Sequence, residues 1–339
     1  MSAFRAWLQL IRVAALPTAL ADVWLGTGTA LLFWSGIWPV VSVSVIALAL
    51  YTAGMILNDA HDVEEDKVHN PGRPLPSGRI SVSVAKAAGF GLLFGAIAGA
   101  GLIGPWTCAV AALLALLIVC YDFILKATLL GPVNMGLCRA VNVVLGMTIA
   151  DAWWPPRSVC TILADISGGV ASSPFGSMLL RRSEWLLLLA LWVFAYVALV
   201  TQFSRFETRK ASAETLRGWL FGASVAILPV ILIFVMSCAS GEYIGEGLVT
   251  PWFHGQKCGL APILVAVVTF GLFAACVTAS WVCALGRRHD ARAAVGFALL
   301  GIIPFQASVA AAVLQWQLAL AIVLLLVPAI FLRKLSHIT

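Results

Sequence analysis

The sequence predicts an all-α protein that crosses a membrane many times. Of its 339 residues, 61% are hydrophobic and only 11% are charged, whereas ordinary soluble domains carry about 25% charged residues. The apolar runs match a bilayer, since about 20 apolar residues cross roughly 30 Å of hydrocarbon. They are too long and continuous for barrel strands, and lipid admits only helices or closed barrels. The expected fold class is therefore a polytopic membrane helical bundle.

Ten apolar runs predict the membrane-spanning helices. If the N-terminus is cytoplasmic, 17 of the 21 Lys and Arg residues lie on that side and four on the other, as the positive-inside rule requires. The formal charge of +6 thus reflects topology, and no nucleic-acid partner is expected. An integral protein of a bacterial inner membrane, with cytoplasmic motif loops, is the default. The runs lie at 13–35, 38–57, 84–103, 105–124, 130–150, 184–203, 216–236, 262–285, 291–311 and 314–332.

Two long loops interrupt the pattern on the predicted non-cytoplasmic side. Residues 152–183 and 237–261 are rich in Ser, Gly and Pro and are expected to be accessory loops. The eight cysteines form no Cys-x-x-Cys motif, so no metal–thiolate site is expected. Cys160, Cys238 and Cys258 lie in or beside these loops, so a disulfide between two of them is an alternative to three free thiols.

Acidic residues gather after the second apolar run. Residues 58–83 hold five of the chain's 15 acidic residues. Asn58, Asp62 and Asp66 are four residues apart, with Asp59 beside the first, so a continuing helix would place these groups on one face. Clustered carboxylates are favourable around a hard cation, and Mg²⁺ prefers oxygen ligands. The alternative is a solvated acidic loop.

Basic residues follow in a stiff loop. Arg73 and Arg79 lie in the stretch PGRPLPSGR, whose prolines restrict the backbone. One guanidinium group binds two phosphate oxygens at once, and Mg²⁺ on the carboxylates would bridge the same oxygens. The two motifs together suit a diphosphate, although either arginine alone would be explained by topology.

A few polar residues fall inside apolar runs. Because ionisable groups are costly in lipid, they are expected to face a cavity or a partner helix. Asp22 and Asn142 are expected to face a cavity, and the alternative is hydrogen bonding between helices. The others in this class are Arg139, Gln202 and Gln306.

The spacing Asn-Asp-x-x-Asp-x-x-x-Asp at 58–66, followed by RPLPSGRIS at 73–81, resembles the first signature of the UbiA family of intramembrane prenyltransferases. Tyr121 with Lys126 is similar to that family's Tyr/Lys element. The stretch 131–147 looks most like the EboC-type branch. The resemblance covers the helical core and the motif loops, and it implies a single domain over 1–339 with nine helices around a lipid-open central cavity, against the ten runs counted above.

The resemblance also implies a site. An isoprenyl diphosphate would be held through Mg²⁺ by two Asp-rich motifs, and Asp122 would orient Lys126. Asp59, Asp62, Asp66 and Lys126 are the expected catalytic residues. The implied metal ligands are Asn58, Asp59, Asp62, Asp66 and Glu207, and the implied substrate-binding residues are Asn58, Arg73, Arg79, Tyr121, Asp122, Asn142 and Glu207.

The second Asp-rich motif departs from the family's pattern. After the sixth run the sequence reads TQFSRFETRK, which leaves Glu207 as the one nearby acid. Glu207 is expected to be a single ligand, with Arg205 or Lys210 supplying further positive charge. Alternatively, these basic residues only anchor topology.

Three functions are compatible with these motifs. The leading one is Mg²⁺-dependent transfer of a prenyl group to an aromatic, quinone-type or other lipophilic acceptor within the membrane. The second is a noncatalytic protein of the same fold that binds or moves a prenyl diphosphate or lipophilic precursor. A CDP-alcohol phosphotransferase is disfavoured, because the Asp-Gly-x-x-Ala-Arg start of its signature is missing.

Overall fold

The computed structural model describes residues 3–30, 37–150, 190–205, 260–285, 291–312 and 316–337, and these ranges contain helices and no strand. Three predicted features lie outside the described residues: the accessory loops except residues 260–261, the run at 216–236, and Cys160, Cys238 and Cys258 of the possible disulfide. The other nine apolar runs fall on helical segments over the residues that the structure describes, some of them as two consecutive helices. The principal helices are α1 (Ala3–Leu10), α2 (Leu16–Ala30), α3 (Ile37–His61), α4 (Val63–His69), α5 (Val82–Ile103), α6 (Pro105–Cys120), α7 (Gly131–Met147), a helix at Ala190–Ser204, α14 (Leu260–Leu285), α15 (Ala291–Leu300), α16 (Ile302–Ala312), α17 (Trp316–Leu324) and α18 (Leu326–His337).

In the described part of the chain, five helical segments are long and apolar enough to cross a membrane, or six if the bent pair α1 and α2 forms one span. The fold is thus an all-helical membrane bundle, as predicted. The total of nine or ten spans stays a prediction.

Local sequence explains where the spans begin and end. The Ser81 hydroxyl accepts a hydrogen bond from the Val84 amide at 3.3 Å and caps the start of α5. Gly104 ends α5, and Pro105 starts α6, where a missing N–H has no cost. Two successive spans therefore reverse direction with a single residue between them.

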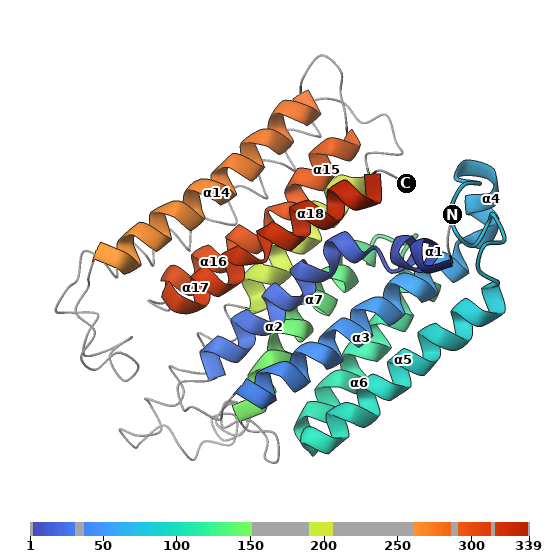
Figure 1. The fold of residues 1–339 in the computed structure, drawn as a ribbon, viewed down its shortest axis with the longest axis horizontal. Helices are drawn as coiled ribbons and strands as arrows, with labels where there is room; N and C mark the ends of the chain where they lie inside the picture. Colours follow the sequence, from blue (N-terminus) through green and yellow to red (C-terminus); the bar gives the residue numbers. More distant parts are fainter. Residues whose placement is uncertain are drawn as a thin grey trace.

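The bundle has two halves that meet along α2 and α7 (Figure 1). In the first half, α3 and α6 pack against α7, and α5 packs against α3 and α6. In the second half, residues of α14 to α18 share one hydrophobic core with the helix at 190–204. Residues of α2 contribute to both hydrophobic cores, Ala21 and Leu25 to one and Val23 to the other. The contact between α2 and α7 therefore holds the halves together.

Glycines bring α2 and α7 into backbone contact. A Cβ atom on Gly26 would lie 1.9 Å from the Val143 carbonyl oxygen, and one on Gly146 would lie 2.2 Å from the Val23 carbonyl oxygen. Close packing of small residues is the usual way in which helices associate in lipid. No larger side chain fits either position without moving a backbone.

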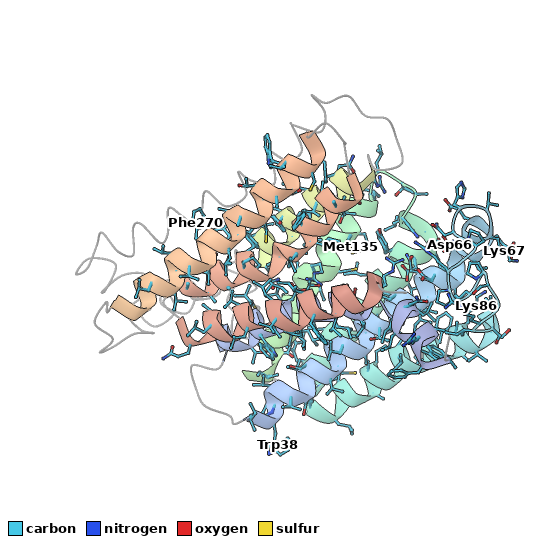
Figure 2. All side chains as sticks on the ribbon, turned by 45° about the horizontal axis from the view of Figure 1, so that its top comes forward. Trp38, Asp66, Lys67, Lys86, Met135 and Phe270 are labelled. Carbon is cyan, nitrogen blue, oxygen red and sulfur yellow. The ribbon has the colours of Figure 1, made fainter. Side chains whose placement is uncertain are left out.

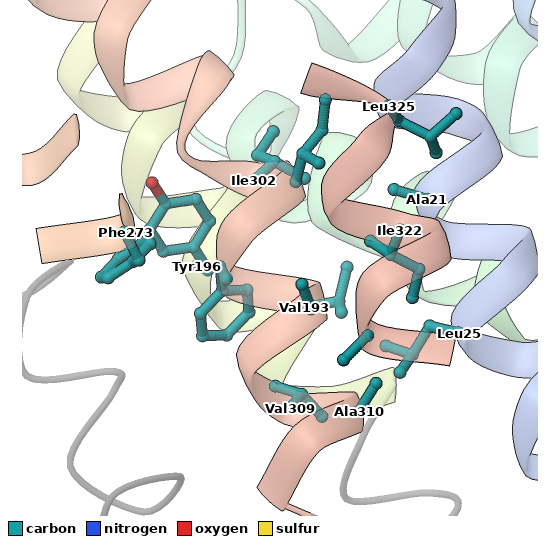
Figure 3. Packing of buried hydrophobic residues seen from close by; sticks show 14 of the residues in the cluster. Ala21, Leu25, Val193, Tyr196, Phe273, Ile302, Val309, Ala310, Ile322 and Leu325 are labelled. Carbon is teal, nitrogen blue, oxygen red and sulfur yellow. The ribbon is translucent and has the colours of Figure 1, made fainter. Parts of the chain in front are cut away.

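Three aromatic rings contact one another inside the largely aliphatic core of the second half, part of which Figure 3 shows. The rings of Tyr196 and Phe305 are stacked with centroids 4.9 Å apart, and Phe273 meets Tyr196 edge-on at 5.7 Å. The Tyr196 hydroxyl donates to the Ala298 carbonyl at 2.8 Å, so its polar end is satisfied inside the core. This cluster places the helix at 190–204 firmly beside α14 and α16.

The first predicted span, 13–35, differs from the structure. A short helix α1 precedes a break, and α2 then runs from Leu16 to Ala30, with a bend of 44° between the two. Arg12 lies in the break with φ 48° and ψ 53°, the one non-glycine residue with positive φ among those described. Its charge explains the break, because the guanidinium reaches a carboxylate of α3 instead of entering the lipid.

Candidate active site

The acidic motif lies where α3 ends and α4 begins. Hydrogen bonds from the Asp62 amide to the Asn58 carbonyl (3.0 Å) and from the Asp66 amide to the Asp62 carbonyl (2.9 Å) continue the helical pattern across the junction. Asn58, Asp59 and Asp66 are buried, and Asp62 is partly buried. The four polar groups are therefore held within about two turns of backbone.

These groups form two sets by their contacts, although their spacing places them on one side of the backbone. Each helical residue turns the direction by about 100°, so on a continuous helix positions 58, 62, 66 and 59 fall within an arc of about 100°. Asn58 and Asp62 make up the first set, and Asp59 and Asp66 make up the second. The first set contacts Lys126, and the second contacts Arg12 and Arg73.

A π-helical turn supplies Lys126 to the first set. Residues Tyr121–Leu125 form this turn after α6, and the Lys126 amide bonds to the Tyr121 carbonyl at 3.0 Å. The Lys126 ammonium forms an ion pair with Asp62 and donates to Asn58 Oδ1 at 3.2 Å. Asn58 in turn donates to the buried Asp122 at 3.0 Å. Asp122 therefore reaches Lys126 through Asn58 in this arrangement.

The second set contains two arginines. Arg12 Nη2 lies 2.8 Å from Asp59 Oδ1. Arg73 Nη1 lies 2.6 Å from Asp66 Oδ2 and 3.9 Å from Asp59 Oδ1. Asn70 also donates to Asp66 at 3.1 Å. One guanidinium group thus lies between two buried carboxylates.

A pocket of about 320 Å³ opens beside the second set. The acidic and basic side chains of this region gather at one end of the bundle, where Figure 2 shows Asp66, Lys67 and Lys86. The volume of the pocket suits a small polar headgroup. The residues that line the pocket are Gln9, Arg12, Asp59, Asn70, Gly72, Arg73 and Pro74.

The donor set fits Mg²⁺. This ion commonly takes one or two protein carboxylates and completes its shell with water and substrate phosphate oxygens. One oxygen of Asp59 and one of Asp66 face the same cation, Arg73, beside the pocket. Two carboxylate oxygens therefore already lie around one positive charge, as they would around a metal ion. Within the described ranges, no three His, Cys, Asp or Glu side chains surround a single point. A substrate would therefore have to complete the metal's shell.

Other predicted site residues lie elsewhere or in different roles. The Arg79 guanidinium donates to Gln9 at 3.1 Å and to the Gly72 carbonyl at 2.5 Å, which ties the loop to α1. Tyr121 starts the π-helical turn and is half-buried. Asn142 lies in the bundle interior, apart from this group. Glu207 lies outside the described residues.

The interior polar residues contact one another. Arg139 Nε lies 2.8 Å from Asp22 Oδ2, and Asn142 donates to the same oxygen at 3.2 Å. Gln306 donates to the other Asp22 oxygen, and Arg139 also donates to the Thr18 carbonyl at 2.8 Å. For Asp22 and Asn142, the alternative of hydrogen bonds between helices therefore describes the structure. This interior network joins α2, α7 and α16.

Sequence reasoning missed three residues that line the pocket, namely Gln9, Arg12 and Asn70. Asn70 carried a signal, because it follows Asp66 by four residues. Gln9 and Arg12 carried none, since the fold brings them to the motif from 47 or more positions away. Arg12 looked like a topology residue.

Three comparisons place these features among known proteins. The model of the UbiA prenyltransferase family matches residues 14–282. A digeranylgeranylglyceryl phosphate synthase of Ignicoccus hospitalis is 37% identical over 153 residues, which cover 44% of this chain and 48% of that protein. The chain thus spans about half the length of this curated relative.

Two solved structures match nearly the whole chain. A structure of digeranylgeranylglyceryl phosphate synthase in membranes covers 93% of this chain and 99% of its own, with 19% identity and a TM-score of 0.55. An apo UbiA homologue from Aeropyrum pernix covers 87% and 97%, with 18% identity and a TM-score of 0.57. The helical architecture is therefore shared. With the family model matched over most of its length, the chain belongs to the UbiA prenyltransferase family.

Proposed function

We propose that this protein transfers a prenyl group from an isoprenyl diphosphate to a lipophilic acceptor within the membrane. The observation that carries the proposal is the set of three buried or partly buried carboxylates, Asp59, Asp62 and Asp66, each paired with a cation at one end of the bundle. The diphosphate would occupy the pocket beside Arg12 and Arg73. The prenyl chain would extend between the helices toward lipid.

The ion pairs provide groups that a diphosphate can recruit. Arg12, Arg73 and Lys126 are each more than a third exposed, so their charged ends are able to turn from a carboxylate to a phosphate oxygen at small cost. Guanidinium groups bind phosphate oxygens in pairs. The same cations would stabilise the negative charge that grows on the leaving diphosphate.

The carboxylates released in this exchange would hold Mg²⁺. Asp59 and Asp66 are its proposed ligands beside the pocket, with Asn58 and Asp62 from the set that contacts Lys126, and Glu207 completing the site from the second motif. When bound, Mg²⁺ neutralises diphosphate charge and so assists departure of the leaving group. Lys126, held by Asn58 and Asp62, would contact the diphosphate from the other side.

Two classes of acceptor are candidates for this reaction. The Ignicoccus relative is named for a digeranylgeranylglyceryl phosphate product, which makes a phosphate-bearing glycerol lipid the first acceptor to test. Aromatic and quinone-type acceptors are the second class. We also propose that the site faces the cytoplasm, because an orientation with a cytoplasmic N-terminus puts 17 of the 21 basic residues on the same predicted side as the motif loops.

Binding of radiolabelled geranylgeranyl diphosphate to the detergent-purified protein, with and without Mg²⁺, tests the proposal. The wild type is expected to bind with Mg²⁺, and both Asp62→Asn and Glu207→Gln are expected to lose this binding. Glu64→Gln is the matched control, because Glu64 is exposed and paired with Lys67. If the wild type shows no Mg²⁺-dependent binding, the diphosphate assignment is wrong.

Turnover separates transfer from mere binding. Release of diphosphate over many cycles, with either acceptor class, would establish a transferase. The second motif has only one acidic residue, Glu207, and this motivates the alternative, a noncatalytic protein that binds or moves a prenyl diphosphate. Tight Mg²⁺-dependent binding without product from any acceptor, together with retained binding in Glu207→Gln, would favour it.

A further inference from the structure

Arg205 contacts the main chain that carries Lys126. Arg205 directly follows the helix at 190–204, and its Nη2 atom donates to the Lys126 carbonyl at 2.6 Å and to the Thr128 carbonyl at 2.5 Å. These carbonyls lie just past the π-helical turn, where a helix leaves its last carbonyls without partners inside the helix. A cation at a helix C-terminus is also favourable for the helix dipole.

Gly131 makes room for this contact. A Cβ atom on Gly131 would lie 2.4 Å from Arg205 Nη2 and 2.9 Å from the carbonyl oxygens of Leu125 and Lys126. Two of these three neighbours are backbone atoms, so a side chain would displace the guanidinium or the turn. The glycine and the arginine are therefore complementary parts of one arrangement.

The contact reaches the candidate active site through one residue. The carbonyl of Lys126 is held by Arg205, while the ammonium of Lys126 contacts Asp62 and Asn58. The helix at 190–204 is itself held in the second half of the bundle by Tyr196. Arg205 thus links that half to the lysine of the first half.

We infer that Arg205 is a positioning residue for Lys126. It holds the 126–131 turn so that the ammonium faces the acidic motif and, on the proposed function, the diphosphate. Arg205 does not touch the diphosphate in this role. The basic residue at the start of the degenerate second motif therefore acts through the backbone of the first half and not only through topology.

Two measurements on the full-length, detergent-purified chain test this inference. The first is amide hydrogen exchange of the 121–131 peptide without ligand. Arg205→Ala and Gly131→Ala are both expected to raise its exchange about tenfold, whereas Lys86→Ala, at an exposed basic residue of α5, leaves it unchanged. Unchanged exchange in both variants would overturn the inference, whatever the ligand does.

The second measurement is a double-mutant cycle for binding of geranylgeranyl diphosphate with Mg²⁺. Arg205→Ala is expected to weaken binding about tenfold in the presence of Lys126 and to have no further effect in a Lys126→Ala background. Equal losses in both backgrounds would show a general structural role and overturn the inference. If Lys126→Ala binds like the wild type while exchange rises in Arg205→Ala, the anchoring role of Lys126 in the proposed function is wrong, whereas Arg205 still positions the 126–131 turn.

Discussion

The polar group at the end of the bundle and the interior polar network contain the same kinds of residue in different surroundings. At the end, Arg12 and Arg73 keep 45% and 38% of their side chains exposed while they contact Asp59 and Asp66. In the interior, Arg139 is 10% exposed and Asp22 is 0% exposed. Both regions pair arginine with aspartate and add an asparagine.

This difference shows that the exposure of the cation distinguishes an ion pair in a binding site from an ion pair that only holds helices together. A partly exposed arginine is able to leave its carboxylate for a ligand, because water and the ligand replace the lost contact. A buried arginine cannot exchange its carboxylate for a ligand in this way. Removing the arginine leaves the carboxylate unpaired in a medium of low polarity. The end of the bundle is therefore suited to binding and the interior to holding helices in register.

The largest expected effect tests the interior side of this comparison. Arg139→Ala should destabilise the fold by about 3–5 kcal/mol, because Asp22 would remain buried without its partner. The measurement is the thermal unfolding midpoint in detergent. Arg12→Ala is the matched control and should cost less than about 1 kcal/mol, since its side chain is partly exposed and Arg73 stays 3.9 Å from the same Asp59 oxygen. Similar losses of stability in both variants would remove the distinction.

The next effect belongs to the end of the bundle. Asp62→Asn should lower prenyl transfer by about 100-fold or more, because it removes the negative charge that holds Lys126 and, on the proposed function, the metal. The thermal unfolding midpoint should stay within a few degrees of the wild type. Turnover of substrate is the measurement, and normal activity of this variant would contradict the proposed role of the acidic motif.

Sequence reasoning predicted most of the fold, because hydropathy in lipid directly determines which segments become helices. It also located Asp59, Asp62, Asp66, Arg73 and Lys126, which the structure brings together at one end of the bundle. Local spacing was enough for the acidic residues and Arg73, since four-residue steps on a helix and a short following loop keep them close. Lys126 is 64 positions from Asp62 and was located through the resemblance to the family's Tyr/Lys element.

What sequence reasoning missed depends on tertiary contacts. The division of the acidic motif into two sets depends on which cations the fold brings to each residue. Arg12 reaches Asp59 from 47 positions away, and nothing in its neighbouring residues marks it. The role of Asn142 likewise depends on its neighbours, because Asp22 comes to it from another helix.

An intermediate effect is expected at the glycines that hold the two halves together. Gly146→Ala should cost about 1–3 kcal/mol, because a Cβ atom there would meet the Val23 carbonyl and force α2 and α7 apart. Their separation would also strain the contacts of Asp22 with α7. Gly91→Ala on α5 is the control, since a Cβ atom there meets nothing within 4 Å. Equal unfolding midpoints for the two variants would refute a tight α2–α7 contact.

The smallest effect sharpens the comparison within the acidic motif itself. Glu64 is two residues from Asp62, but its side chain is 78% exposed and pairs only locally with Lys67 at i,i+3. Glu64→Gln should therefore change stability by less than about 0.5 kcal/mol and leave both diphosphate binding and turnover at wild-type values. If this variant lost activity as Asp62→Asn does, negative charge in the loop as a whole would matter, and burial beside a movable cation would not be what distinguishes a site residue.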